Sequence, residues 1–131
     1  MAYYRAALWQ RKRIKHMKKM ADALNQLPKP IVDKRHNLFI YLENDRARTN
    51  QTRIEHIFDA KHDLNIQDIK RIPREIKKCI FKKDKERKET FNVYIRRNNY
   101  SAEYIKISLD ITKEEPHKGT IKTIYITKNI K

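Results

Sequence analysis

Two histidines in one short stretch of the sequence are the residues of this chain best suited to proton transfer. His56 and His62 lie six positions apart within residues 52–62. On one helix they would point about 120° apart, which is unsuitable for holding a metal ion together. His62 follows Phe58 by four residues, at the edge of an apolar stripe and near the expected helix end. A histidine there can exchange protons near neutral pH, although a boundary histidine bonded to the backbone would show the same pattern.

A second set of candidate residues comes from alternation in the C-terminal third. Apolar and polar residues alternate in 91–96, 104–111 and 123–127, which predicts three strands with one polar face. That face carries Tyr94, Arg96, Tyr104, Lys106, Ser108, Thr123, Tyr125 and Thr127. Rings, cations and hydroxyls together offer stacking, phosphate binding and hydrogen bonds to single-stranded nucleic acid. An ordinary solvated sheet face would use the same residues, since Thr and Tyr favour strands.

The charge balance of the chain predicts a polyanionic partner. Among 131 residues, 32 Lys and Arg stand against 16 Asp and Glu, a net charge of +16. Such a surplus is self-repelling unless a nucleic acid, an anionic membrane or an acidic protein compensates it. The single cysteine, Cys79, excludes an intrachain disulfide and is typical of a reducing, cytoplasmic compartment. We find no apolar run of the ~20 residues that a membrane-crossing helix needs.

The elements that must position these residues begin with a basic helix. Apolar residues recur at three- and four-residue spacings over residues 3–27, and Pro28 and Pro30 end the pattern. Its expected phosphate-binding cations are Arg11, Lys12, Arg13 and Lys15. The helix could bind RNA, lie on a membrane or dock on the core, and its interrupted apolar stripe makes the membrane least favoured. We divide the chain into this helix (residues 1–30) and one domain (residues 31–131).

Further elements follow from pattern and capping residues. Residues 38–42 predict a strand, and a helix capped by Thr49 or Asn50 is expected to run to about Lys61. Asn65 is a cap for a short helix, and Pro73 begins another with Ile76 and Ile80 inward. Residues 82–89 are expected to form a solvated hairpin loop. Helices followed by an antiparallel meander predict an α+β fold, with the helices on one face of the sheet.

Most other chemistries fit the composition poorly. One glycine excludes a Gly-rich phosphate loop, and no Cys/His spacing typical of a zinc site is present. The acidic residues are scattered among Lys and Arg, unlike those of a two-metal nuclease. We therefore expect no metal and no cofactor, which leaves metal-free acid–base chemistry. RNA cleavage fits because the 2′-OH is an internal nucleophile that needs only a base, a phosphate-stabilising cation and an acid.

Several short motifs point to one superfamily. They are Arg53-Ile54-Glu55-His56-Ile57, Lys61-His62, Ile69 with Ile72-Pro73 and Ile76, Phe91-Asn92-Val93-Tyr94, and Lys122-Thr123-Ile124-Tyr125-Ile126-Thr127. Together they resemble the barnase–EndoU–colicin–RelE-like nucleases, above all the branch of phages, mobile elements and polymorphic toxins. The similarity covers residues 38–131 and leaves the basic helix outside. It implies helices packed on a curved antiparallel sheet and metal-independent RNA cleavage on the open sheet face.

The resemblance also implies roles for particular residues. By position, His62 matches the family's helix-end histidine, while Thr123 and Tyr125 match its final-strand hydroxyl and aromatic residue. Arg96 matches a sheet cation. Lys61 stands where an arginine is common, and the essential histidine is either His56 or His62. The expected nucleic-acid contacts are Lys61, Arg53, Tyr94, Lys106 and Lys122, besides the cations of the N-terminal helix.

These observations lead to one expected function and two alternatives. The leading interpretation is a ribonuclease or ribonuclease-like toxin domain that cleaves RNA in a cytoplasm, with an acidic immunity or antitoxin protein as a further candidate partner. The first alternative is a non-catalytic nucleic-acid-binding protein of a phage or mobile element. The second is an adaptor for an acidic protein.

Overall fold

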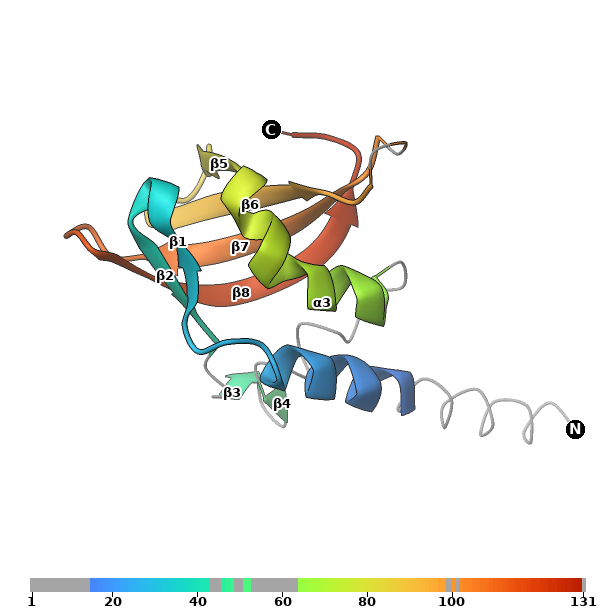
Figure 1. The fold of residues 1–131 in the computed structure, drawn as a ribbon. Coiled ribbons are helices and arrows are strands. Elements are labelled where there is room, and N and C mark those ends of the chain that lie inside the picture. Colours follow the sequence, from blue (N-terminus) through green and yellow to red (C-terminus); the bar gives the residue numbers. More distant parts are fainter. Residues whose placement is uncertain are drawn as a thin grey trace, which may run out of the picture.

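Six strands form one curled sheet in the computed structural model, which describes residues 15–42, 46–48, 51–52, 64–98, 100 and 102–130 (Figure 1). Their order across the sheet is β1–β2–β8–β7–β6–β5. The strands are β1 (Ile31–Asp33), β2 (Leu38–Tyr41), β5 (Ile80–Lys83), β6 (Thr90–Arg96), β7 (Tyr104–Ile111) and β8 (His117–Thr127). Two short strands, β3 (Arg46–Arg48) and β4 (Gln51–Thr52), pair only with each other.

The α+β class is confirmed, but the sheet is not wholly antiparallel. Strands β6 to β8 form the antiparallel meander that the alternation predicts, and β5, which the alternation did not predict, extends it antiparallel to β6. Strand β2, however, pairs with β8 in parallel, from Leu38 opposite His117 to Tyr41 opposite Thr120. No local turn joins these two strands, so the sequence between them carries no signal for their direction. Strand β1 then extends the sheet antiparallel to β2.

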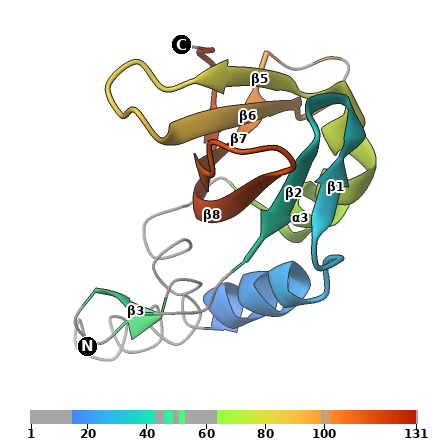
Figure 2. The ribbon, with the colours of Figure 1, turned by 90° about the vertical axis from the view of Figure 1, so that its left-hand side faces the viewer.

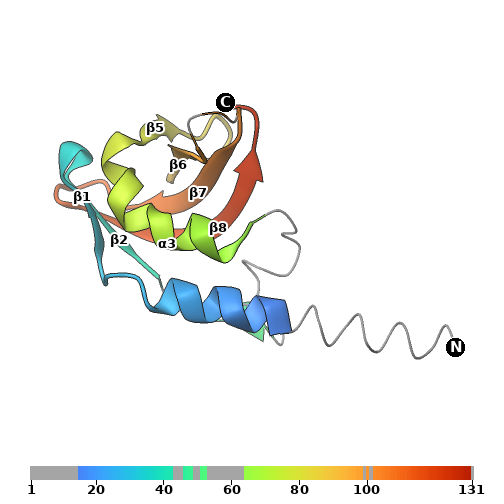
Figure 3. The ribbon, with the colours of Figure 1, turned by 45° about the vertical axis from the view of Figure 1, so that its right-hand side comes forward.

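Helix α3 (Ile66–Glu75) covers the apolar face of β6, β7 and β8 (Figures 1 and 3). Asn65 caps it as predicted, in a reciprocal capping box with Asp68. The prediction that Pro73 begins a new helix is wrong, because Pro73 lies inside α3. Proline costs the helix one hydrogen bond there, and α3 passes into the 3-10 turn η2 (Ile76–Lys78) soon afterwards.

The basic helix contributes to the same core as the sheet. Residues 15–25 are helical, whereas residues 1–14 of the predicted helix lie outside the described residues. Met20, Ala23 and Leu24 are buried in one cluster with aliphatic residues of α3 and the sheet. The boundary at residue 30 remains a prediction, but this packing makes Met20, Ala23 and Leu24 part of the domain's core. Within the described residues, no helix has the length and apolar character needed to cross a membrane.

Three local predictions are corrected by the structure. Gln51 and Thr52 form strand β4, so a helix capped by Thr49 or Asn50 does not begin there. Strand β5 extends through Lys83, which shortens the predicted hairpin loop at its start. Ile80 does not point inward; it is 38% exposed, because its place opposite Tyr94 puts it on the face away from α3.

Curling brings the two outermost strands of the sheet together. Strands β1 and β5 stand at opposite ends of the strand order, yet the chain at the end of β1 contacts the chain just before β5. Figure 2 shows β1 and β2 approaching β5 and α3 on the helical side. A turn of 3-10 helix, η1 (Lys34–His36), links β1 to β2 at this point. The sheet is therefore a half-barrel with a seam.

Candidate nucleic-acid interface

The polar residues of β6, β7 and β8 lie in register on the sheet face opposite α3, which we call the outer face. Three rows cross these strands, and each contains one residue from every strand. The rows are Arg96–Tyr104–Thr127, Tyr94–Lys106–Tyr125 and Asn92–Ser108–Thr123. The alternation therefore identified the residues that share this face. The register of the strands shows which of these residues are neighbours.

Lys106 stands at the centre of the outer face between two aromatic rings. Its Nζ lies 5.8 Å from the centroid of Tyr94 and 5.2 Å from that of Tyr125, both within the range of a cation–π contact. Burial alone would lower the pKa of Lys106, but a hydrogen bond with Tyr125 and the field of the two tyrosines outweigh burial and raise it. Lys106 is thus a positioned cation at neutral pH.

Tyr94 is not an exposed stacking surface, contrary to the prediction. Only 1% of Tyr94 is exposed, although it lies on the outer face. The two rings next to Lys106 are thus covered to different extents. Tyr125 remains half-buried and is the ring that a ligand can reach. Tyr94 therefore supports Lys106 rather than offering a surface of its own.

The row beside Lys106 carries the hydroxyls and an amide. Ser108 Oγ donates to Asn92 Oδ1 over 2.9 Å, and Asn92 is only 3% exposed. Thr123 lies opposite Ser108 and is half-buried, next to a bulge in β8. The bulge turns both Lys122 and Thr123 away from the core, between the buried Ile121 and Ile124. A hydroxyl and a cation thus flank the central lysine.

The remaining predicted cations differ in availability. Arg96 is exposed at the end of β6, one row from Lys106. Lys122 is already paired, because its Nζ lies 3.3 Å from Asp110 Oδ2. Lys15 is exposed on the basic helix, while Arg11, Lys12, Arg13, Arg53 and Lys61 lie outside the described residues. The outer face therefore holds two predicted cations without a carboxylate in contact among the described residues, Lys106 and Arg96.

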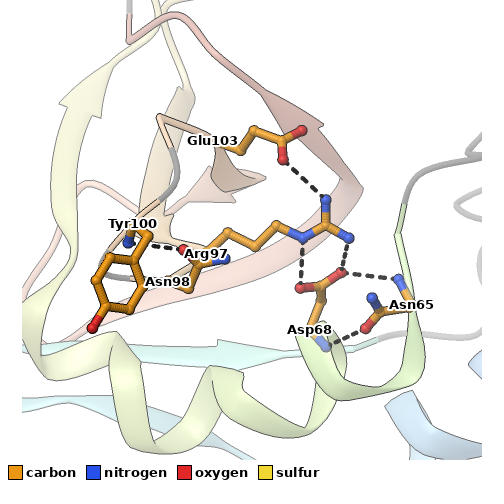
Figure 4. Close-up of polar contacts among 6 residues, drawn as sticks. All are labelled: Asn65, Asp68, Arg97, Asn98, Tyr100 and Glu103. Atoms are coloured by element: carbon orange, nitrogen blue, oxygen red, sulfur yellow. Dashed lines mark hydrogen bonds and ion pairs between the residues drawn. The ribbon is translucent and has the colours of Figure 1, made fainter.

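An ion-pair network locks the start of α3 to the turn between β6 and β7 (Figure 4). Arg97 donates to both carboxylate oxygens of Asp68, over 3.1 and 3.0 Å, and its other nitrogen reaches Glu103 at 3.4 Å. Asp68 also accepts the backbone N–H of Asn65 over 2.9 Å. The sequence predicted Asn65 as the helix cap, but it did not predict the ion pair between Asp68 and Arg97. This network fixes α3 beside Arg96, whose carbonyl accepts from Arg71 at 3.4 Å.

The two histidines proposed as catalytic, His56 and His62, lie outside the described residues. The three described histidines are placed elsewhere. His16 is exposed on the basic helix, and His117 begins β8 with its Nδ1 2.8 Å from the Thr112 carbonyl oxygen. His36 belongs to the seam. No imidazole therefore lies on the part of the outer face that the structure describes.

The seam holds a cluster that sequence spacing did not reveal: Asp33, His36 and Cys79, which we call the seam cluster. His36 Nδ1 lies 2.6 Å from Asp33 Oδ2, and the Cys79 thiol donates to the same oxygen over 3.5 Å. Burial, together with the charge of Asp33, raises the pKa of Cys79 to about 12. Arg35 donates to the Cys79 carbonyl oxygen. The Asp33/His36 spacing was visible, but Cys79 joins them only through the curl of the sheet.

A shallow hollow of about 590 Å³ lies at the far end of the outer face, around the turn between β7 and β8. Its walls mix acids with lysines: Glu89, Asp110, Glu114, Lys113 and Lys118. Such a mixed lining does not favour phosphate, so the central rows remain the better candidate interface.

Comparison of the chain with protein-family models, with curated proteins and with solved structures finds no match.

Proposed function

We propose that this chain binds RNA across its outer face and cleaves it through the 2′-OH without a catalytic metal. The observation that carries the proposal is Lys106, a fixed cation held between Tyr94 and Tyr125 in the middle of the sheet. A phosphate with two negative oxygens in the transition state is stabilised by such a preorganised charge. The reaction is proposed to take place in a cytoplasm.

The neighbours of Lys106 supply the other contacts that the reaction needs. Tyr125 stacks on a base or donates its hydroxyl, and Thr123 hydrogen-bonds to a phosphate oxygen in the adjacent row. Arg96 binds the next phosphate along the strand, from the row on the other side. Base stacking on one ring and phosphate contacts on either side are the general mode by which sheets bind single strands. The net charge of +16 strengthens the encounter.

One of the two proton transfers, as general acid or general base, is assigned to His62 or His56. The base takes the 2′-hydroxyl proton as that oxygen attacks phosphorus, and the acid gives a proton to the departing 5′ oxygen. The products are a 2′,3′-cyclic phosphate and a free 5′-hydroxyl. In sequence, His62 precedes Leu64 by two residues, and Leu64 is buried where the Arg97–Asp68 network anchors the start of α3.

The test is a cleavage assay on a short RNA in the presence of EDTA. We expect cleavage of the RNA, 2′,3′-cyclic phosphate ends, and no cleavage when the nucleotide at the scissile bond is 2′-deoxy. Lys106→Met removes the charge with little change of volume and should slow cleavage by about 10²-fold. Lys77→Met is the matched control, since Lys77 is exposed on η2, away from the outer face. Cleavage of the deoxy substrate, or full activity of Lys106→Met, would contradict the mechanism.

A second candidate function is RNA binding without cleavage. It is favoured by the lack of an imidazole on the described part of the outer face. In that case the cleavage assay leaves the RNA intact. RNA affinity, measured separately, falls with salt and is weakened by Lys106→Met. Absence of binding to any polynucleotide would contradict both functions and leave an acidic protein as the partner.

A further inference from the structure

The seam cluster contains a buried carboxylate whose hydrogen bonds are unevenly distributed. Asp33 is fully buried, and its Oδ2 is hydrogen-bonded to both His36 Nδ1 and the Cys79 thiol. Its Oδ1 is also buried but has no hydrogen-bond partner among the described residues. A buried carboxylate oxygen without a partner is costly and is found where a ligand or ion completes the site. The seam cluster therefore has a buried oxygen, Asp33 Oδ1, that a bound ion or ligand could contact.

The three side chains offer the donor set of a particular metal. One imidazole nitrogen, one thiol sulfur and one carboxylate oxygen all lie within 4.8 Å of one another. Zinc takes nitrogen, sulfur and oxygen ligands at about 2.0–2.3 Å, which places neighbouring donor atoms about 3.3–3.8 Å apart in a tetrahedral site. The Cys79 sulfur already lies 3.5 Å from Asp33 Oδ2. His36 Nδ1 lies only 2.6 Å from that oxygen, so zinc binding requires the imidazole to move outward or the ion to bind the unpartnered Oδ1. Magnesium and calcium prefer oxygen ligands alone, so the thiol disfavours them.

Charge balance allows a divalent ion at this place, even with the Arg35 guanidinium next to Cys79. A zinc ion bound by the carboxylate of Asp33 and the thiolate of Cys79 forms a neutral unit, which can be buried at little cost. Zinc binding releases the thiol proton, and the imidazole binds in its neutral form. The His36 side chain is 26% exposed, so solvent reaches this side of the cluster and can supply a fourth ligand.

We propose that Asp33, His36 and Cys79 bind one zinc ion that joins the two edge strands of the curled sheet. Asp33 belongs to β1, His36 to η1 and Cys79 to the residue before β5, so the ion links segments far apart in the sequence. His36 also stacks on Phe81 of β5, with centroids 4.7 Å apart, which holds its ring at the seam. The proposal does not depend on RNA cleavage, because the cluster lies on the helical side of the sheet.

The direct test is metal titration of the full, tag-free chain. We expect one equivalent of zinc to bind, and cobalt to give a thiolate-to-metal charge-transfer band at the same stoichiometry. Because Cys79 is the only cysteine, such a band assigns the ligand. Cys79→Ser should abolish the band, and His36→Gln should weaken zinc binding about 100-fold or more. His117→Gln is the control, since His117 also lies by a carboxylate, 3.7 Å from Glu115, but has no thiol nearby.

Thermal unfolding gives a second, independent readout. Zinc at 100-fold above its dissociation constant should raise the Tm by on the order of 10 °C, and the two variants should lose this rise. No binding at one equivalent, unchanged zinc affinity in Cys79→Ser, or no effect of zinc on Tm would each overturn the proposal. If zinc joins the two edge strands, EDTA should lower the Tm. RNA cleavage in EDTA, measured well below that Tm, therefore still tests the outer face alone.

Discussion

The inner and outer faces of β6, β7 and β8 come from alternate residues of the same strands, but they are packed differently. The inner face is aliphatic, and Val93, Ile107 and Ile124 in its central row are fully buried against α3. The outer face places a cation between two rings and leaves most of its residues half-buried. Packing of the first kind provides stability. The outer face keeps charge and hydroxyls available for a ligand. We therefore expect substitutions on the inner face to lower stability and substitutions on the outer face to weaken binding.

The largest expected effect concerns catalysis without loss of stability. His62→Ala should slow RNA cleavage by about 10²–10⁴-fold, as expected for a lost general acid or base, with little change in RNA affinity. Thr123→Ala should act in the same direction but more weakly. Single-turnover rates and RNA affinities of both variants, with His117→Gln as control, check this. An active His62→Ala with an inactive His56→Ala would transfer the role to His56 and keep the enzyme class.

The comparison itself is tested most directly by two neighbouring residues of β7. Ile107 is fully buried on the inner face, so Ile107→Ala should lower the free energy of unfolding by about 2–5 kcal/mol. Lys106→Met on the outer face should change it by less than about 1 kcal/mol, because its apolar stem is kept. Urea unfolding of both variants measures the difference. A large loss in Lys106→Met would show that the outer face is also structural.

Much of this architecture could be predicted because its signals are local. Alternation identifies both faces of the meander, and Asn65 identifies the start of α3. The parallel pairing of β2 with β8 could not be predicted, since it joins strands with no turn between them. Gly119 illustrates the same limit. It lies near the start of β8, where a Cβ would come within 3.2 Å of Leu38 Cδ1 on β2, and nothing in the local sequence indicates this close contact.

The candidate site could be predicted only in part, for a physical reason. Period-two alternation assigns a residue to a face, but it does not reveal how strongly the sheet curls. Tyr94 is buried although it lies on the outer face, and the curl brings Cys79 to Asp33 at the seam. Both outcomes depend on distant segments, so no spacing in the sequence encodes them. The roles assigned to His56 and His62 remain predictions.

An intermediate effect is expected at the network that joins the start of α3 to the turn between β6 and β7. Arg97→Ala leaves the buried carboxylate of Asp68 without its bidentate partner and should cost about 2–3 kcal/mol of unfolding free energy. Arg97→Lys keeps the charge but not the two parallel hydrogen bonds, so it should restore only part of this loss. A double-mutant cycle with Asp68→Asn measures the coupling. Additive losses would show that Arg97 and Asp68 act independently.

The smallest expected effect distinguishes two kinds of outer-face lysine: Lys106, which has no carboxylate in contact among the described residues, and Lys122, which is paired with one. Each lysine that neutralises one phosphate of single-stranded RNA contributes about 0.7 to the slope of log affinity against log salt. Lys106→Met should therefore reduce that slope by about 0.7. Lys122→Met should reduce it less, because Lys122 is already paired with Asp110 at 3.3 Å and must break that pair to bind phosphate.

The measurement is RNA affinity over a series of salt concentrations for the wild type and the two variants. Asp110→Asn sharpens it: releasing Lys122 from its carboxylate should steepen the salt dependence, and adding Lys122→Met should cancel that gain. Equal slopes for Lys106→Met and Lys122→Met would mean that the ion pair does not restrict Lys122. An unchanged slope in Lys106→Met would mean that the central lysine contacts no phosphate, and the binding surface would then have to lie on the basic helix instead.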